Sequence, residues 1–379
     1  MNTTTHRAIV RDGTDVRVLE RPTPRPGPGE LLVAPEVAGL CGTDLQMLRG
    51  LRDDPAPVIG HEGIAVVVEA GPGTDASLAP GTRVVVNPTH PTDDSFLLGH
   101  GVDGLLQERV LLPAAAVGGG LVIPLQATPE PELAALLEPL AVVRYALSAL
   151  AADRPGTLLV HGDGTIGHLA VRAARYWLGP SVRVLQVHHT EAGRAWSADR
   201  AVAADHLLLH GDDNAGVIRE VAGSEPLAVL LATPRDATLD CLTSTLATGV
   251  AAMTVDLLGG LPPGASTPCL PGADLAGIRA ANRAGLPEPP HVTTLTATTG
   301  GTVRLLGHRG VGNGHLRAAA EELTHHPERY REVVTHTADL TEAARIMAHL
   351  ARRGDRVVDG RRLVKLAVRV HPPRHALEA

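Results

Sequence analysis

The chain has 379 residues, 44% of them hydrophobic and 20% charged, which is enough for two domains with sizeable cores. A formal net charge of −7 and an aromatic content of 2% argue against a nucleic-acid partner, which favours a basic face and stacking aromatic side chains. The N-terminus has no apolar stretch behind a basic one, and no run of about 18 apolar residues is evident. We therefore expect a cytoplasmic protein with neither a secretory signal nor a membrane span.

Short β-type segments separated by Gly and Pro dominate the first third of the chain. The expected strands cover residues 7–10, 16–19, 31–37, 64–69, 83–86 and 105–112. Turn signals such as Gly71-Pro72-Gly73 and Pro80-Gly81 separate them. This spacing predicts an irregular, partly barrel-like β domain.

Strand and helix alternate after an Ala/Leu-rich helix at residues 129–152. The expected strands are 157–161, 182–187, 206–209, 227–231 and finally 303–306, and the expected helices are 166–178, 192–203, 215–222 and 315–324. This alternation predicts an α/β domain with a doubly wound parallel sheet. Segments 333–335, 341–351 and 363–368 are expected to rejoin the first domain.

A glycine-rich turn follows the first strand of this alternation and precedes its helix. The motif consists of Gly162, Asp163, Gly164, Thr165, Ile166 and Gly167. In a G-x-G-x-x-G turn the first glycine permits a tight turn, the second lets the backbone approach a pyrophosphate, and the third lets the helix pack closely. The helix N-terminus then offers free N–H groups to phosphate, so we expect a dinucleotide site.

The end of the next strand bears on the choice between NAD and NADP. An acidic residue there would bind the adenosine ribose, but the sequence has His188-His189 instead. These histidines and Arg194 are candidates for contacts to a 2′-phosphate, although solvated loop residues are an equally good interpretation. The sequence favours NADP over NAD by a small margin.

Residues of the types that bind zinc occur before the dinucleotide turn. Cys41-Gly42-Thr43-Asp44 and Gly60-His61-Glu62 lie in the β domain, and Glu138 opens the long helix. Thiolate, imidazole and carboxylate are the ligands of open, catalytic zinc sites. The other two cysteines, Cys241 and Cys269, are too scattered for a disulfide framework or a four-cysteine zinc knuckle.

With these motifs the chain resembles the zinc-dependent medium-chain dehydrogenases, a superfamily of alcohol, sorbitol, threonine and glucose dehydrogenases. The resemblance rests on Gly60-His61-Glu62, on Glu138-Pro139-Leu140, which matches the polyol and sugar branch, on the turn at 162–167, and on Thr335-His336. It implies a groES-like catalytic domain (residues 1–143 and 327–379) and a Rossmann domain (residues 144–326).

The resemblance also implies the chemistry of the site. One catalytic zinc would be held by Cys41, His61 and Glu138, with Glu62 a direct ligand or a neighbour of the ligands. Zinc would lower the pKa of a substrate hydroxyl, Thr43 would relay its proton, and the nicotinamide would accept a hydride. Alternatively, Thr43 is an N-cap of the helix that follows it.

Three departures from the family pattern stand out. The segment 87–103 has no cysteine, so the structural zinc lobe of many relatives is missing. Gln46 stands where many relatives have a proton-relaying histidine, which leaves solvent as the favoured route and Glu62 or His100 as alternatives. The segment 259–301 is longer than usual and carries an expected helix at 274–283.

The sequence thus predicts an NAD(P)-dependent zinc oxidoreductase acting on a secondary alcohol or ketone of a polyol, sugar or cyclitol. The same parts are compatible with an epimerase or lyase that acts through a transient ketone, and with a catalytically silent, dehydrogenase-derived binding protein. We expect a small-molecule alcohol or ketone partner, and a homodimer or homotetramer because sheet edges favour pairing.

Overall fold

The computed structural model describes residues 4–371, which divide by their contacts into two compact units. The first unit is Met1–Glu138 with Gly312–Ala379, and the second unit is Pro139–Val311. These bounds differ from the predicted domain boundaries at 143/144 and 326/327. The helix at 313–325 belongs to the first unit because Asn313 donates to the carbonyl of Gly120 (2.8 Å) and accepts from the side chain of Asn87 (2.9 Å).

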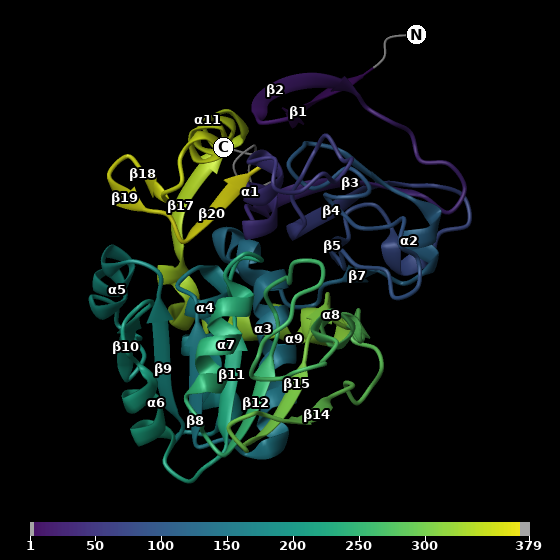
Figure 1. Ribbon diagram of the computed structural model, residues 1–379. Helices are drawn as coiled ribbons and strands as arrows, with labels where there is room; N and C mark the ends of the chain where they lie inside the picture. Colours follow the sequence, from purple (N-terminus) through teal and green to yellow (C-terminus); the bar gives the residue numbers. More distant parts are fainter. Residues whose placement is uncertain (1–3, 372–379) are drawn as a thin grey trace. The chain divides into compact units, whose positions relative to one another are not determined.

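The second unit contains most of the α/β alternation (Figure 1). Its elements are α3 (Leu137–Leu150), η3 (Ala151–Asp153), β8 (Thr157–His161), α4 (Thr165–Leu178), β9 (Arg183–His188), α5 (Glu191–Ala198), β10 (His206–Leu209), α6 (Ala215–Ala222), β11 (Leu227–Leu231), α7 (Thr238–Ala247), β12 (Ala252–Asp256), α8 (Leu275–Ala280), β13 (Asn282–Arg283), β14 (Thr293–Thr296), β15 (Thr302–Leu306) and β16 (His308–Arg309).

The second unit is built on a sheet with the order β10-β9-β8-β11-β12-β15-β14. The first six strands are parallel, and their order is that of the doubly wound dinucleotide-binding fold, so the predicted fold class of this unit is confirmed. β8 and β11 are buried along their whole length, as expected for central strands covered on both faces by helices. The order reverses beside β8, which places the glycine-rich turn at the switch point.

The segment 259–301 extends this sheet, which the sequence did not predict. β14 pairs antiparallel with β15, so the strand expected to end the sheet is not its edge. The helix expected at 274–283 is shorter, because α8 ends at Ala280 and the next residues form β13. The side-chain amide of Asn282 holds β13 in place by donating to the carbonyls of His291 (3.1 Å) and Gly307 (2.9 Å).

The first unit contains a second, mostly antiparallel sheet and two small hairpins. Its elements are β1 (Thr5–Asp12), β2 (Asp15–Pro22), β3 (Leu31–Gly39), α1 (Gly42–Leu48), β4 (Glu62–Ala70), η1 (Ala76–Leu78), β5 (Arg83–Val86), β6 (Val110–Leu112), α2 (Ala114–Gly118), β7 (Val122–Pro124), η2 (Pro131–Leu136), α9 (Asn313–His325), α10 (Pro327–Tyr330), η4 (Arg331–Val333), β17 (Val334–Asp339), α11 (Leu340–Arg352), β18 (Val357–Val358), β19 (Arg361–Arg362) and β20 (Lys365–Arg369).

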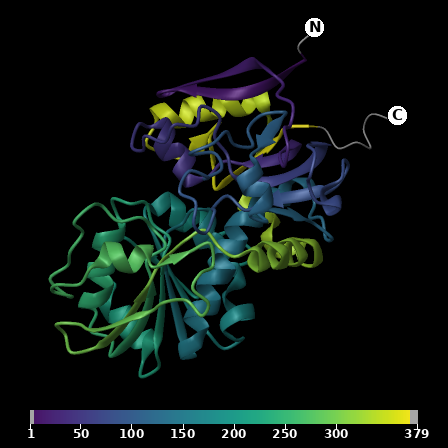
Figure 2. The same cartoon turned by 90° about the vertical axis from the view of Figure 1, so that its right-hand side faces the viewer.

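The C-terminal elements join the first unit as the sequence predicted. The sheet order is β17-β20-β3-β4-β5-β7, with β6 paired to β3, so a strand from the end of the chain lies beside one from its start. Helix α11 lies beneath the β1–β2 hairpin, as Figure 2 shows, and its apolar side chains Ile346 and Met347 belong to the same buried cluster as Ile9 of β1. This arrangement fixes the start of β4 and the end of β3, from which the candidate site is built.

One helical run meets the length and composition of a membrane span. Residues Pro131–Asp153, from η2 to η3, have a mean hydropathy of 1.6, but 83% of the tested window is buried inside the protein. The sequence predicted no membrane span, and among the described residues this helix is the one that meets these criteria. Burial of this kind is typical of a core helix, whose apolar side chains are already in contact with other parts of the protein.

Candidate active site

Three predicted metal ligands meet at one end of the β3–β4 pair. Gly39 at the end of β3 is opposite Glu62 at the start of β4, and Cys41 follows two residues later as the N-cap of α1. The ligand atoms of Cys41, His61 and Glu62 all lie within 4.8 Å of one another. Antiparallel pairing thus brings together residues that are twenty positions apart in the sequence.

His61 and Glu62 of the cluster are buried and Cys41 is half-buried, and the site carries polar atoms that lack a protein partner among the described residues. His61 Nδ1, Asp44 Oδ1 and the hydroxyl of Thr43 have no hydrogen-bond partner among the described residues, and His61 Nδ1 lies 3.8 Å from Asp44 Oδ1. Burial opposes protonation of His61, but the Cys41 thiol and Asp44 outweigh it and raise the pKa of the imidazole well above its ordinary value.

Asp44 holds the start of α1 in place. Its Oδ2 accepts the backbone N–H of Cys41 at 2.8 Å, and burial raises the pKa of its carboxyl. Because Cys41 is the N-cap and Thr43 the second helical residue, the alternative of Thr43 as an N-cap is wrong. The Thr43 hydroxyl therefore keeps its hydrogen-bonding capacity for something other than the helix.

Lys365 completes the cluster and was missed by the sequence reasoning. This lysine, the only one in the chain, is 0% exposed, and its ammonium forms an ion pair with the carboxylate of Glu62. A Cβ on Gly39 would lie 2.8 Å from Lys365 Nζ, so the glycine leaves room for the side chain. A single lysine inside an apolar strand was the signal that could have found it, since lysine is rarely buried without a partner.

The fourth predicted ligand, Glu138, is buried but stands outside the three-residue cluster. It lies in the first turn of α3 and is 8% exposed. Burial raises the pKa of its carboxyl to about 7. The interaction with His61 opposes this rise, and the interaction with Glu62 adds to it. The carboxyl is thus within electrostatic reach of the cluster, and its role as a ligand stays a prediction.

The donor set of the cluster fits a zinc ion. A thiol, an imidazole nitrogen and a carboxylate converge, which is the set of ligand types that open zinc sites use. His61 Nδ1 has no hydrogen-bond partner among the described residues, so the imidazole is not fully committed to the protein around it. His100, the predicted alternative proton acceptor, lies directly against His61, with 5.0 Å between the ring centroids.

The glycine-rich turn of the second unit has the conformation that the motif requires. Gly162 has φ +123°, and a Cβ there would lie 2.3 Å from the carbonyl oxygen of Ala232. A Cβ on Gly167 would lie 2.1 Å from the carbonyl oxygen of Gly162. Gly164 is the N-cap of α4, and the residues between Gly162 and Ile166 are partly accessible. The turn therefore offers the N-terminus of α4 to a ligand, which suits a pyrophosphate.

The structure treats the three candidates for contacts to a 2′-phosphate differently, and of the two histidines only His189 is exposed. His188 is 0% exposed, and its ring nitrogens face Ser197 Oγ (2.8 Å) and the carbonyl of Leu208 (3.1 Å). The expectation for His188 is therefore corrected, because its side chain is used inside the unit. Arg194 lies on the surface of α5 and pairs with Glu191 at 2.9 Å.

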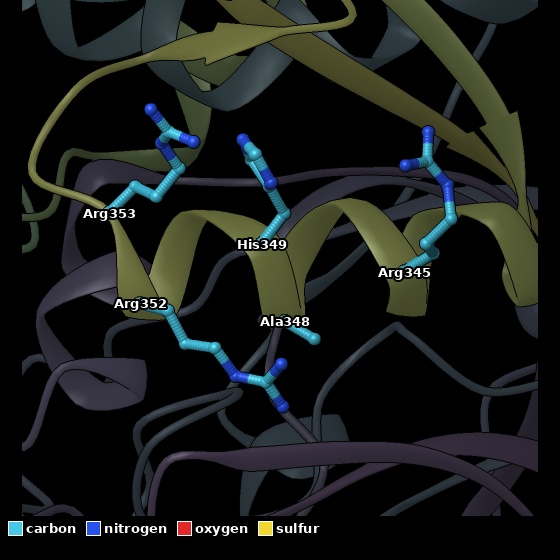
Figure 3. Close-up of a pocket in the computed structure, with 5 residues that line it drawn as sticks. All are labelled: Arg345, Ala348, His349, Arg352 and Arg353. Atoms are coloured by element: carbon cyan, nitrogen blue, oxygen red, sulfur yellow. The ribbon is translucent and has the colours of Figure 1, made fainter.

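A surface hollow of about 420 Å³ lies on α11, away from all of these residues. It is lined by Arg345, Ala348, His349, Arg352 and Arg353 (Figure 3). Arg345 pairs with Asp359 at 2.9 Å, and His349 Nε2 lies 3.0 Å from the carbonyl of Val357. These side chains hold the β18–β19 hairpin on the helix, and we assign the hollow no binding role.

Comparison with known proteins agrees with this geometry. Residues 27–120 match the family model of the alcohol dehydrogenase GroES-like domain. Over 240 residues the chain is 29% identical to glucose 1-dehydrogenase of Thermoproteus tenax, covering 56% of this chain and 67% of that protein. Over 225 residues it is 26% identical to sorbitol dehydrogenase of Bombyx mori, covering 55% of this chain and 62% of that protein, or somewhat less than two thirds of its length.

A solved structure extends the similarity of fold to both units. A protein from Sinorhizobium meliloti 1021, crystallised with NADP, superposes with a TM-score of 0.70 at 22% identity, covering 97% of this chain and 100% of that one. At this identity the likeness speaks for the fold alone. Together with the matched family model, it confirms the predicted groES-like unit and Rossmann unit.

Proposed function

We propose that this chain, which resembles the medium-chain alcohol dehydrogenases, is a nicotinamide-dependent oxidoreductase that acts through one zinc ion on an alcohol of the polyol, sugar or cyclitol class. The reaction would oxidise a secondary alcohol to a ketone, or reduce the ketone. The observation that carries the proposal is the convergence of Cys41, His61 and Glu62 within 4.8 Å.

The residues of the first unit have distinct tasks in this proposal. Cys41, His61 and Glu138 would hold the metal, and Glu62, which pairs with Lys365, would be a direct ligand or a neighbour of the ligands. When bound, zinc supplies a Lewis acid that lowers the pKa of a hydroxyl and stabilises the alkoxide. The buried hydroxyl of Thr43, which has no partner among the described residues, is available to accept a hydrogen bond from the hydroxyl of a substrate alcohol.

Lys365 holds the charge of Glu62 in place. Its ammonium lies against the Glu62 carboxylate and 3.4 Å from the carbonyl of Leu40. An ion pair of this kind gives the buried Glu62 carboxylate a compensating charge and limits how freely it can turn toward a metal. Glu62 therefore acts as a charged neighbour of the ligands, or as a ligand that exchanges between the lysine and the metal.

The second unit would bind the nicotinamide cofactor. The turn from Gly162 to Gly167 would hold the pyrophosphate at the N-terminus of α4. We propose NADP rather than NAD because the end of β9 carries no acid and Arg194 lies near the start of α5. The substrate class rests on the similarity to glucose and sorbitol dehydrogenases.

The proposal is tested by metal analysis together with a nicotinamide absorbance assay. The purified protein should contain one zinc per chain and reduce NADP or NAD with at least one member of a panel of sugars, polyols and cyclitols. Cys41→Ser should lose most of the metal, because the harder oxygen is a poorer match for zinc than thiolate. Full activity of a protein without metal would contradict the proposal. Bound zinc and turnover of substrate without net reduction would favour an epimerase or lyase instead.

We also propose a cytoplasmic homodimer or homotetramer. The outer edge of β14 has no strand partner within the part of the chain that the structure describes, and an exposed edge of this kind favours pairing with a second copy.

A further inference from the structure

Two Gly-His pairs from separate loops pack against each other beside the metal cluster. Gly60 has φ +96° and precedes His61, and Gly99 has φ +74° and precedes His100. A Cβ on Gly99 would lie 2.8 Å from the carbonyl oxygen of Gly60, so the two backbones touch only because Gly99 lacks a side chain. The contact brings the two imidazole rings to 5.0 Å between centroids, tilted by 39°.

The ring of His100 is itself held by the loop at residues 52–56. Its Nδ1 lies 2.8 Å from Asp54 Oδ2, and the same oxygen accepts Arg52 Nε at 2.8 Å. Its backbone carbonyl accepts the N–H of Ala56 at 2.8 Å. The side chain of His100 is 6% exposed. Both the position and the plane of this ring are therefore fixed by the loop at 52–56.

We propose that His100, anchored by Asp54 and Arg52, is a positioning residue that sets the plane of the His61 imidazole for metal binding. The inference rests on the proposed function, because it needs a metal at His61. Groups behind a ligating histidine normally fix its ring through a hydrogen bond. Here His61 Nδ1 has no such bond, since Asp44 Oδ1 lies 3.8 Å away, and the face of the ring is supported instead.

The contact on His61 comes from the segment at residues 87–103, which contains no cysteine and so lacks the structural zinc lobe. Residues 87–103 are short, and Gly99-His100 lies at the end of that segment, directly over Gly60-His61. The sequence named His100 as an alternative proton acceptor. Its contact with His61, with Nδ1 directed to Asp54, favours a different role, in which the ring acts through its neighbour.

The experiment measures metal affinity and ligand geometry rather than turnover. Metal-free protein is titrated with Zn²⁺ in competition with a chromophoric chelator, and with Co²⁺ while its visible absorption spectrum is recorded. The variants are His100→Ala, His100→Phe, Asp54→Ala, Asp54→Asn and the double variant His100→Ala/Asp54→Ala. The control is His6→Ala, because His6 is also buried in the first unit but lies near Thr23 and Gln107.

We expect His100→Ala to weaken zinc binding about 10- to 100-fold and to shift the cobalt spectrum. Asp54→Ala keeps the His100 ring but removes its hydrogen-bond partner, and His100→Phe keeps an aromatic ring that cannot bond to Asp54. Both variants should weaken zinc binding less than His100→Ala does. Asp54→Asn keeps an acceptor and should restore affinity. The double variant should be no weaker than His100→Ala, because both residues act through one contact. His100→Phe fills the same space, which keeps the test valid if His100→Ala folds poorly.

Two results would overturn the inference while leaving the proposed function intact. One is a wild-type protein that binds zinc together with a His100→Ala variant of equal affinity and unchanged cobalt spectrum. The other is an equal loss of affinity in His6→Ala, which would indicate general destabilisation. A folded wild-type protein that binds neither metal would instead contradict the proposed function, and the inference with it.

Discussion

Individual buried charges carry much of the chemistry of this protein, and Lys365 is the clearest case. Replacing Lys365 with Met leaves the Glu62 carboxylate buried without its cation, since the two side chains are 0% and 3% exposed. We expect a loss of about 3–5 kcal/mol in the free energy of unfolding, measured with urea on metal-free protein. Adding Glu62→Gln should recover part of the loss.

Arg369, which lies on β20 with Lys365 and forms an exposed ion pair, provides the control for Lys365. Arg369 pairs with Glu132 at 2.5 Å, with side chains 53% and 32% exposed. Arg369→Met should cost less than about 1 kcal/mol because solvent screens the pair. Similar losses for Lys365→Met and Arg369→Met would show that burial does not make Lys365 special.

His161 makes stability depend on pH. Burial, with a smaller contribution from His210, lowers the pKa of His161 to about 4. An unfolded histidine titrates near ~6.5, so the unfolded chain binds the proton first as the pH falls. The contribution of His161 is therefore complete above about pH 6.5 and is lost progressively toward pH 4, by about 3 kcal/mol in total.

The variant His161→Gln isolates this effect. Its amide can keep the hydrogen bond to Thr245 Oγ1, which is 2.9 Å long in the native structure, but it does not titrate. Urea midpoints between pH 4 and 7 should fall less steeply for the variant than for the wild type. Parallel curves would mean that His161 keeps an ordinary pKa in the folded protein.

Arg194 tests the choice of cofactor at the level of one side chain. Its guanidinium is 38% exposed and pairs with Glu191, so it can turn toward a 2′-phosphate at little cost. Arg194→Ala should weaken NADP binding more than NAD binding in calorimetric titrations. An equal effect on both cofactors would rule out a contact between Arg194 and the 2′-phosphate.

At the scale of elements, the packing of α4 on β8 determines whether the dinucleotide turn forms. Gly167→Ala would place a Cβ 2.1 Å from the carbonyl oxygen of Gly162 and force the helix away from the strand. We expect a loss of about 1–3 kcal/mol in unfolding free energy, typical of overpacking, together with weaker NAD(P) binding.

The matched control is another glycine in the first turn of a helix. Gly216 lies in α6, and a Cβ there would have no heavy atom within 4 Å. Gly216→Ala should leave cofactor affinity unchanged and stabilise the protein by up to about 1 kcal/mol, because alanine is the better helix former. The prediction fails if both variants behave alike.

At the scale of the whole molecule, the edge strand β14 provides a test of the proposed assembly. Thr294 and Thr296 are exposed on this strand, whose other side pairs with β15. Replacing both with Lys should oppose edge-to-edge pairing of two copies, because like charges would meet across the interface. Light scattering should then give a lower mass than for the wild type, which we expect to be at least a dimer.

A matched double change keeps that comparison fair. The control places the same added charge at exposed positions away from the edge, Ser181→Lys and Ser224→Lys. Their charges should leave the mass unchanged. A wild-type monomer at micromolar concentration would contradict the proposed oligomer.

The sequence by itself determined the features that depend on neighbouring residues. The strands 157–161, 206–209 and 227–231 and the helix 215–222 were predicted with the bounds that the structure has, because apolar runs end there at clear turn signals. The glycine-rich turn was predicted because its conformation is set by Gly162, Gly164 and Gly167 within six residues. Local steric rules are sufficient at this range.

Tertiary structure decided everything that depends on which distant segments meet. Lys365 reaches Glu62 because β20 joins the sheet that contains β3 and β4, and His100 reaches His61 because Gly99 packs on Gly60. His188 is turned inward because Ser197 and the backbone of β10 offer partners inside the unit. Hydrogen bonds and ion pairs between residues far apart in sequence have no local signature. They form only when the burial of apolar strands brings their elements together.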